Sequence, residues 1–185
     1  DMQLYLVDPA FQDLAEKSGI GGVLSSLSES VDTLRVVRTN IGGANTDHVV
    51  RDAIGHETTV GEDGALRNRV TITRMHLGRR GALFTGTRSR DYLRIYIPKG
   101  SQLLDAEGFS LPTRAREIPP EEYRDDPALA YLSSLRHDAT KRVDIFSEGN
   151  RTVIGGWVEL DPGEVKTLVL TYGLPFTIFS ERLGT

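Results

Sequence analysis

The sequence predicts a mainly β protein: an antiparallel β-sandwich of about seven strands with a short N-terminal helix and a helical insertion. Runs rich in Val, Ile, Thr and Tyr alternate with polar residues at the period of two that is typical of strands. Short turns rich in Gly, Asp, Asn and Pro separate these runs. The regular alternation of strands and helices that a parallel sheet requires is not visible, so we expect antiparallel strands.

We divide the 185 residues into an N-terminal strand–helix appendage, residues 1–32, and a β-sandwich domain, residues 33–185, with its insertion near residues 110–139. In the appendage, residues 2–7 alternate as in a short strand. Asp8-Pro9 then has the form of a helix start, because an N-cap acceptor precedes Pro at the first helical position. The chain begins with Asp rather than Met, so we expect a mature product or part of a longer protein.

In the first half of the sandwich domain, the sequence predicts a hairpin with a shorter strand before it and another after it. Residues 34–37 predict a first strand. Residues 47–60 and 66–77 predict the two arms of a hairpin, and glycine at either end of the connecting segment can supply positive φ. Residues 92–97 form the clearest strand, whose side chains alternate between two faces. Leu93, Ile95 and Ile97 lie on one face; Tyr92, Arg94 and Tyr96 lie on the other.

The second half predicts a helical insertion followed by three strands. In the insertion, Asp125 or Asp126 can cap a short helix that runs to His137. Three strands follow with tight turns between them, and we expect them to form an antiparallel meander. These strands cover residues 141–147, 151–160 and 165–172.

Composition excludes several classes of function. The chain has no cysteine, which excludes a disulfide scaffold, thiolate zinc sites and a cysteine nucleophile. The formal net charge is −4, which argues against a nucleic-acid partner or a polybasic membrane surface. No apolar run reaches the roughly 20 residues of a membrane helix, so we do not expect this chain to span a membrane. We expect no cofactor.

A turn rich in oxygen-bearing side chains is a candidate metal site. Asn40, Asn45 and Asp47 could supply ligands to a hard cation such as Ca²⁺, which binds several oxygens from a flexible loop. The alternative is a turn between strands, in which the Asn and Asp side chains bond to neighbouring backbone groups.

Aromatic strand residues are a candidate binding surface. Tyr92, Arg94 and Tyr96 share a strand face that we expect to be exposed, and Trp157 lies on the face of its own strand opposite the aliphatic residues. Aromatic faces stack on sugar rings, and Arg pairs with carboxylates or phosphates of an anionic glycan. The alternative is that these aromatic side chains fill the core, because Tyr and Trp are common in strands.

A cluster of arginines could bind phosphate groups. It contains Arg79, Arg80, Arg88 and Arg90, and the alternative interpretation is an exposed, solvated loop.

The chain has no GxSxG, P-loop or GxGxxG motif in a suitable context, and its four His residues lie far apart. We therefore expect a protein that is not an enzyme.

The order of the motifs resembles the C-terminal region of a bacterial envelope family, domain of unknown function four-zero-one-two. The strongest piece is YLRIYIPKGS at residues 92–101. The other matching pieces are QLYL (3–6), FQDL (11–14), the glycines of 19–22, TNIGGANTD (39–47), RTVIGGWVEL (151–160) and YGLP (172–175). The resemblance spans most of the chain, and residues 110–139 are the least covered.

The resemblance implies an extracytoplasmic location in a bacterium. Proteins of this family resemble exported proteins with an N-terminal transmembrane helix, and their upstream core is distantly similar to the LytR–CpsA–Psr group, which attaches glycopolymers to the cell wall. This chain would then be a non-enzymatic binding or scaffolding module of a larger envelope protein, with cell-wall glycopolymer or another envelope protein as its partner. The alternatives are an accessory domain of a glycopolymer-transferring enzyme whose catalytic core lies upstream, and a self-associating surface module that pairs through strand edges.

Overall fold

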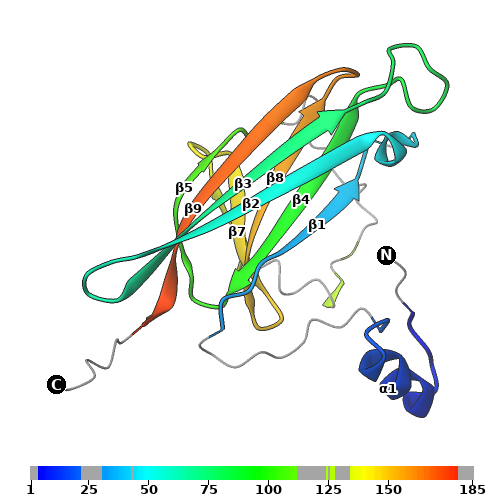
Figure 1. Cartoon of the computed structure of the whole chain (residues 1–185). Coiled ribbons are helices and arrows are strands. Elements are labelled where there is room, and N and C mark those ends of the chain that lie inside the picture. The colour runs from blue at the N-terminus through cyan, green and yellow to red at the C-terminus, as the bar shows by residue number, and fades with distance from the viewer. Residues whose placement is uncertain are drawn as a thin grey trace.

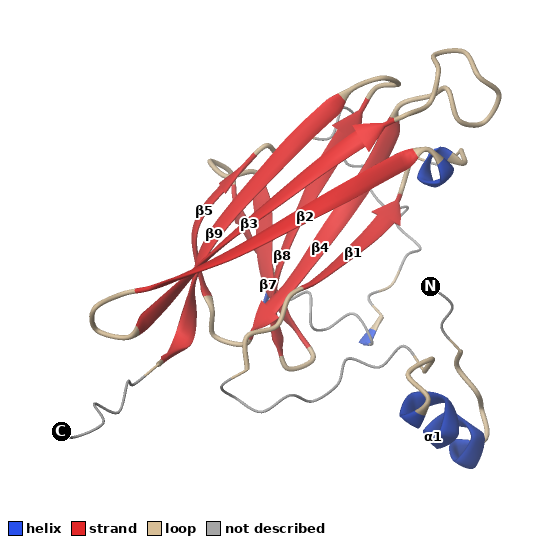
Figure 2. Cartoon of the chain, in the orientation of Figure 1, coloured by secondary structure: helices blue, strands red, loops and turns tan. Residues whose placement is uncertain are grey.

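A computed structural model describes residues 4–21, 31–42, 44–111, 124, 126–127 and 134–178. Within these residues the protein is mainly β, with nine strands in two antiparallel sheets and one α-helix (Figures 1 and 2). The expectation of about seven strands was therefore too low. Short edge strands account for the difference, because three to six residues carry little periodic signal of their own.

One sheet has five strands and the other has four. The five-stranded sheet contains, in spatial order, β1 (Arg35–Asn40), β4 (Ser89–Pro98), β8 (Arg151–Leu160), β7 (Val143–Glu148) and β6 (Arg136–Asp138). The four-stranded sheet contains β2 (Val50–Val60), β3 (Ala65–His76), β9 (Val165–Thr177) and β5 (Gln102–Glu107).

The N-terminal helix α1 (Pro9–Lys17) begins where the sequence predicts. The Asp8 carboxylate accepts the backbone N–H of Ala10 at 2.8 Å, which is the expected N-cap bond. The predicted strand at residues 2–7 is wrong for the described residues 4–7. The backbone N–H of Leu4 donates to Ile20 O, so this segment bonds to the residues after the helix instead of to another strand.

The hairpin of β2 and β3 confirms the sequence prediction. Its register pairs Val60 with Leu66 and Val50 with His76 without interruption. The turn closes with a bond from Gly61 N–H to Ala65 O, and Gly64 has a φ of 78°, a conformation that glycine adopts without strain.

The predicted meander of the last three strands is wrong in its second half. β7 and β8 form a hairpin, but β9 pairs with β3 and β5 in the other sheet. The turn after β8 bonds to the end of β3: Gly163 N–H donates to His76 O, and His76 N–H donates to Glu164 O. A tight turn has the same local sequence whether the next strand pairs or crosses, so only these tertiary bonds decide between the two.

The predicted insertion lies mostly outside the described residues. At its end, residues 136–138 form β6, an edge strand, where the sequence predicted the last turn of a helix. β6 forms because Arg136 to Asp138 pair with Ile145 to Val143. Residues 112–123, 125 and 128–133, where the rest of that helix was expected, are not described.

One cluster of buried apolar side chains contains residues from both sheets. Because successive side chains of a strand point to opposite faces, the cluster takes its members from alternate positions of these strands. The members at zero exposure are Val70, Ile72, Leu93, Ile95, Ile97, Ile154, Val158, Leu160, Leu168, Leu170 and Tyr172.

A buried ion pair joins the two sheets at one end of this cluster. Arg74 of β3 and Asp91 of β4 are both fully buried, with Arg74 Nη2 2.7 Å from Asp91 Oδ2. Arg74 Nε also donates to Asp52 of β2 at 2.8 Å. Asp91 accepts a further bond from the Ser89 hydroxyl. The Arg74 guanidinium therefore contacts one carboxylate from each sheet, Asp52 on β2 and Asp91 on β4.

The opposite end of β3 carries a buried tyrosine contact. Asn68 donates to the hydroxyl oxygen of Tyr172 at 3.2 Å and to the carboxylate of Asp32 at 2.8 Å. Burial, with a smaller contribution from the Asp32 charge, raises the pKa of Tyr172 to about 12.

We expect Arg74→Leu to lower the free energy of unfolding by about 3–5 kcal/mol, because it leaves buried Asp91 without its counter-charge. The double variant Arg74→Leu/Asp91→Leu should recover much of this loss, since both charges are removed. Urea denaturation of the parent, the two single variants and the double variant measures the coupling. Purely additive losses would contradict a buried pair.

Tyr172 should make the protein less stable at alkaline pH. Unfolded Tyr titrates near 10 and folded Tyr172 near 12, so between these values unfolding releases a proton. Stability should therefore fall by roughly 2–3 kcal/mol from pH 10 to pH 12, and this component should be absent in Tyr172→Phe. The exposed Tyr5→Phe is the matched control and should keep the parent slope; equal slopes in all three proteins would show that Tyr172 titrates normally.

Candidate functional site

The outer face of the five-stranded sheet, the side away from the main core, carries a second small apolar cluster. Tyr96, Phe146 and Val153 form it, and Val37 and Leu135 pack against them. Tyr96 is only 4% exposed. The expectation of an exposed Tyr92–Arg94–Tyr96 face was therefore wrong at Tyr96, because neighbouring strands place apolar side chains beside its ring.

Arg94 and Tyr96 are both bonded to one carboxylate. The Tyr96 hydroxyl donates to Glu148 Oε2 at 2.9 Å, and Arg94 Nη1 lies 3.3 Å from the same oxygen. The Arg94 guanidinium carbon is 5.9 Å from the centre of the Tyr96 ring, a cation–π distance. These two predicted binding residues therefore brace β4 against β7.

Tyr92 and Trp157, the other two predicted binding residues, lie together. They are directly opposite in the β4–β8 register, and their ring centres are 5.3 Å apart in an edge-to-face arrangement. The Tyr92 hydroxyl donates to Asp144 Oδ2 at 2.7 Å. Trp157 is the only tryptophan of the chain, so its fluorescence reports on this place alone.

Asp144 also holds a histidine. His137 Nδ1 is 2.8 Å from Asp144 Oδ1. An ionised carboxylate only accepts hydrogen bonds, so His137 Nδ1 carries a proton and donates it to Asp144, which leaves Nε2 free of this contact. The His137 side chain is about half exposed. Tyr92 and His137 thus hold the Asp144 carboxylate from two sides and fix its orientation.

Two glycines in β8 make space for this arrangement. A Cβ on Gly155 would lie 2.2 Å from the Tyr92 hydroxyl, which crosses over this residue to reach Asp144. A Cβ on Gly156 would lie 2.3 Å from the ring of Phe109, which fills the core on the other face. The Gly-Gly pair therefore admits one aromatic ring on each face of the sheet.

A pocket lies where β7 leaves the edge of β8. The β7–β8 ladder covers β8 only from Arg151 to Gly155. Beyond it, Ser110 N–H donates to Trp157 O at 2.7 Å, an isolated bridge between the segment after β5 and β8. The pocket here measures about 420 Å³, and its lining residues are Ser110, Leu111, Leu135, His137, Arg142, Asp144 and Trp157.

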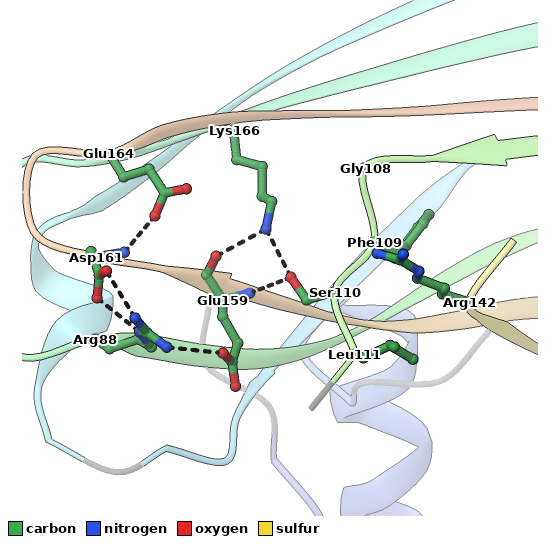
Figure 3. Close-up of a pocket in the computed structure, with 10 residues that line it drawn as sticks. All are labelled: Arg88, Gly108, Phe109, Ser110, Leu111, Arg142, Glu159, Asp161, Glu164 and Lys166. Atoms are coloured by element: carbon green, nitrogen blue, oxygen red, sulfur yellow. Dashed lines mark hydrogen bonds and ion pairs between the residues drawn. The ribbon is translucent and has the colours of Figure 1, made fainter. Parts of the chain in front are cut away.

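A second pocket of about 540 Å³ adjoins the first and shares Ser110, Leu111 and Arg142 with it (Figure 3). An ion network forms much of its wall. Arg88 makes two bonds to the Asp161 carboxylate, Nε–Oδ1 at 2.8 Å and Nη2–Oδ2 at 2.9 Å (Figure 3). These bonds hold the pKa of Asp161 below its usual range.

The same network shows how two of the predicted phosphate-binding arginines are placed. Glu159 lies 3.4 Å from Arg88 and 3.3 Å from Arg90, so both guanidinium groups have carboxylate partners within the chain. Lys166 Nζ donates to Ser110 Oγ at 2.8 Å, and Ser110 Oγ accepts Glu159 N–H (Figure 3). The network thus fixes Ser110, and through it the bridge to Trp157.

Arg142 lies at the boundary between the two pockets. It has a φ of 57°, in the left-handed region that few side chains adopt, and it immediately precedes β7. It is exposed, and within the described part of the chain no hydrogen bond or ion pair joins its side chain. Its guanidinium is therefore available to an anionic group that enters either pocket.

The predicted metal ligands form a hydrogen-bonded turn. Asn40 Nδ2 donates to Asp47 Oδ2 at 3.2 Å and to Thr46 Oγ1 at 3.1 Å, so the amide presents its donor to the carboxylate. Asn45 precedes the short 3₁₀ turn and makes no side-chain cap bond there. Asn40 and Asp47 are therefore bonded to each other within the turn. In the described residues, no group of three or more His, Asp or Glu side chains could hold a metal ion.

Comparisons with known proteins give no match to this chain: no family model, no curated protein and no solved structure matches it. Among the helices of the described residues, none is both long and apolar enough to cross a membrane.

Sequence reasoning missed the four polar residues that line the pocket: Ser110, His137, Arg142 and Asp144. A signal existed for Asp144 alone, because it alternates with Phe146 and Glu148 on the strand predicted over residues 141–147. The sequence predicts a helix at His137, and the contact of Ser110 with Trp157, 47 positions away in sequence, has no local signature.

We expect Gly155→Ala to displace the Tyr92 ring, break its bond to Asp144 and lower the free energy of unfolding by about 1–3 kcal/mol. The fluorescence of Trp157 should change, since Tyr92 is its ring neighbour. Gly173→Ala is the matched control, because no atom lies within 4 Å of its added Cβ. Parent-like emission and stability in Gly155→Ala would show that the Tyr92 position does not depend on this glycine.

Proposed function

We propose that this chain is a non-enzymatic carbohydrate-binding module of a larger bacterial cell-envelope protein. We further propose that its two sheets pack face to face as a β-sandwich, which the shared apolar cluster supports. The ligand is a sugar unit of an anionic cell-wall glycopolymer, bound in the pocket beside Trp157.

One observation carries the proposal: a single pocket combines Trp157, the oriented Asp144–His137 pair and Arg142, which has no ion-pair partner among the described residues. A sugar ring has an apolar face, which packs on an aromatic side chain, and a rim of hydroxyls, which need fixed donors and acceptors. Asp144 supplies acceptors at this rim, His137 Nε2 adds a further hydrogen-bonding group, and Leu111 and Leu135 add apolar wall.

Arg142 suits the charge of the ligand. Its planar guanidinium pairs with a carboxylate or phosphate through two parallel bonds, which a neutral sugar cannot offer. The neighbouring arginines Arg88 and Arg90 already have carboxylate partners within the chain. Arg142 is therefore the arginine at this surface that we expect to bind an anionic group of the ligand.

The envelope location rests on the resemblance of residues 92–101 and 151–160 to the envelope family. In that setting the module lies outside the cytoplasm, attached through an upstream part of its parent protein. There it would bind glycopolymer while other parts of the parent act on it or anchor it.

The test is co-sedimentation of the purified chain with bacterial sacculi, native or stripped of anionic glycopolymer, combined with Trp157 fluorescence. We expect binding to native sacculi only. Trp157→Leu and Arg142→Asn should each weaken binding at least about tenfold, or about 1.4 kcal/mol. Asn tolerates positive φ, so Arg142→Asn removes the charge without adding backbone strain.

Two controls make the outcome specific. Arg142→Lys keeps the charge and should bind with intermediate affinity. Arg80→Asn removes an exposed arginine of the 78–88 loop, outside both pockets, and should bind like the parent. Equal binding of all variants, or no binding to native sacculi, would overturn the glycopolymer proposal.

A further inference from the structure

The outer edge of β2 is the longest free strand edge among the described strands. β2 lies at the edge of the four-stranded sheet, with β3 as its only described neighbour (Figure 1). It has 11 residues, and every residue from Ala53 to Val60 is exposed. The other edge strands, β1, β5 and β6, have three to six residues. A long free edge is a template for pairing with another strand.

The ladder with β3 determines which backbone groups of β2 point outward. Two printed bonds define its ends: Gly61 N–H donates to Ala65 O, and Leu77 N–H donates to Val49 O. Antiparallel bonds recur at every second residue, and the register between these ends has no shift. Odd-numbered residues of β2 therefore bond to β3. The even-numbered residues direct their N–H and C=O groups outward; these are Val50, Asp52, Ile54, His56, Thr58 and Val60.

We propose that two copies of this chain pair antiparallel along β2, with the two-fold axis at Ile54. In this register even-numbered residues face even-numbered residues, so the outward groups of the two copies meet. Arg51 lies opposite the partner's Glu57, and Asp52 lies opposite the partner's His56. The symmetry produces each contact twice, and the two four-stranded sheets join into one of eight strands.

Charge selects this register over its neighbours. With the axis at Ala53, Arg51 would face Gly55; with the axis at Gly55, it would face Thr59. With the axis at Asp52 or Glu57, like charges would meet at the axis, which is unfavourable. Only the axis at Ile54 places each of the two strand carboxylates opposite a basic side chain of the partner.

The single chain leaves the main pair unsatisfied. Arg51 bonds only to backbone oxygens among the described residues, those of His48 and Val50. Glu57 is exposed, and in the described part of the chain no hydrogen bond or ion pair joins its carboxylate, although Arg69 lies opposite it in the β2–β3 register. Asp52 is shared with Arg74, so its contact with the partner's His56 is the weaker of the two. Ile54 is 49% exposed and would pack against its own copy at the axis.

Pairing at β2 is independent of the sugar pocket, which lies on the other sheet. A dimer would hold two pockets, and a polymer that reaches both would bind more tightly than one pocket allows.

Sedimentation equilibrium of the purified chain at a range of concentrations tests the proposal. We expect a concentration-dependent monomer–dimer equilibrium. Arg51→Glu and Glu57→Arg should each raise the dimer dissociation constant at least about tenfold, because each places two like-charge pairs across the axis. The charge-swapped double variant Arg51→Glu/Glu57→Arg should return to within about threefold of the parent, because the register again opposes unlike charges.

Two further variants separate pairing from folding. Ile54→Lys places two ammonium groups at the axis and should abolish the dimer, with parent-like circular dichroism because the side chain is exposed. Arg79→Glu in the 78–88 loop should dimerise like the parent. A chain that stays monomeric at about 1 mM, or a double variant that stays as weak as the single variants, would overturn this pairing. Binding to sacculi by a monomeric variant would leave the sugar proposal standing.

Discussion

The contact of Arg74 with Asp91 and Asp52 constrains the rest of the structure. A guanidinium with no exposure needs its carboxylates in place, because an uncompensated buried charge costs several kcal/mol. Asp91 belongs to the five-stranded sheet and Asp52 to the edge of the other. Apolar contacts elsewhere in the core are non-directional and tolerate sliding. The ion pair does not, so it fixes how β4 lies against β3.

From this end of the core, polar contacts lead outward to the candidate site. Next to Arg74 on the inner face of β3, buried His76 accepts Gly78 N–H at Nδ1 and so donates from Nε2 to Thr87 O. Its backbone holds the turn that carries the chain into β9. This turn presents Asp161 to Arg88, and β9 presents Lys166 to Ser110, which bridges to Trp157. The pocket is thus positioned by hydrogen bonds that begin at the junction of the two sheets.

Both proposals rest on strand edges that the ladders leave free. The proposed sugar-binding pocket lies where β7 stops covering β8. There, Gly155 and Gly156 have no side chains, and aromatic rings on either face of the sheet fill that space. The proposed pairing surface lies along β2, where the outward backbone groups have no partner strand among the described residues. The two surfaces carry different chemistry. The pocket combines an aromatic ring with an oriented carboxylate, whereas the β2 edge has a self-complementary order of charges.

The sequence by itself determined that the chain is mainly β with antiparallel strands. It also determined the helix at Asp8-Pro9, the β2–β3 hairpin and the approximate course of β4, β7, β8 and β9, because alternation, caps and turns act within a few residues. It also indicated that Tyr92 and Trp157 lie off the core faces of their strands. Tertiary structure decided what lies far apart in sequence: that β9 crosses to the other sheet, that Tyr96 is covered, and that residues 136–138 pair as a strand. It also brought His137 and Asp144 to Tyr92 and bridged Ser110 to Trp157, since such contacts depend on where strands end and on which neighbours they meet.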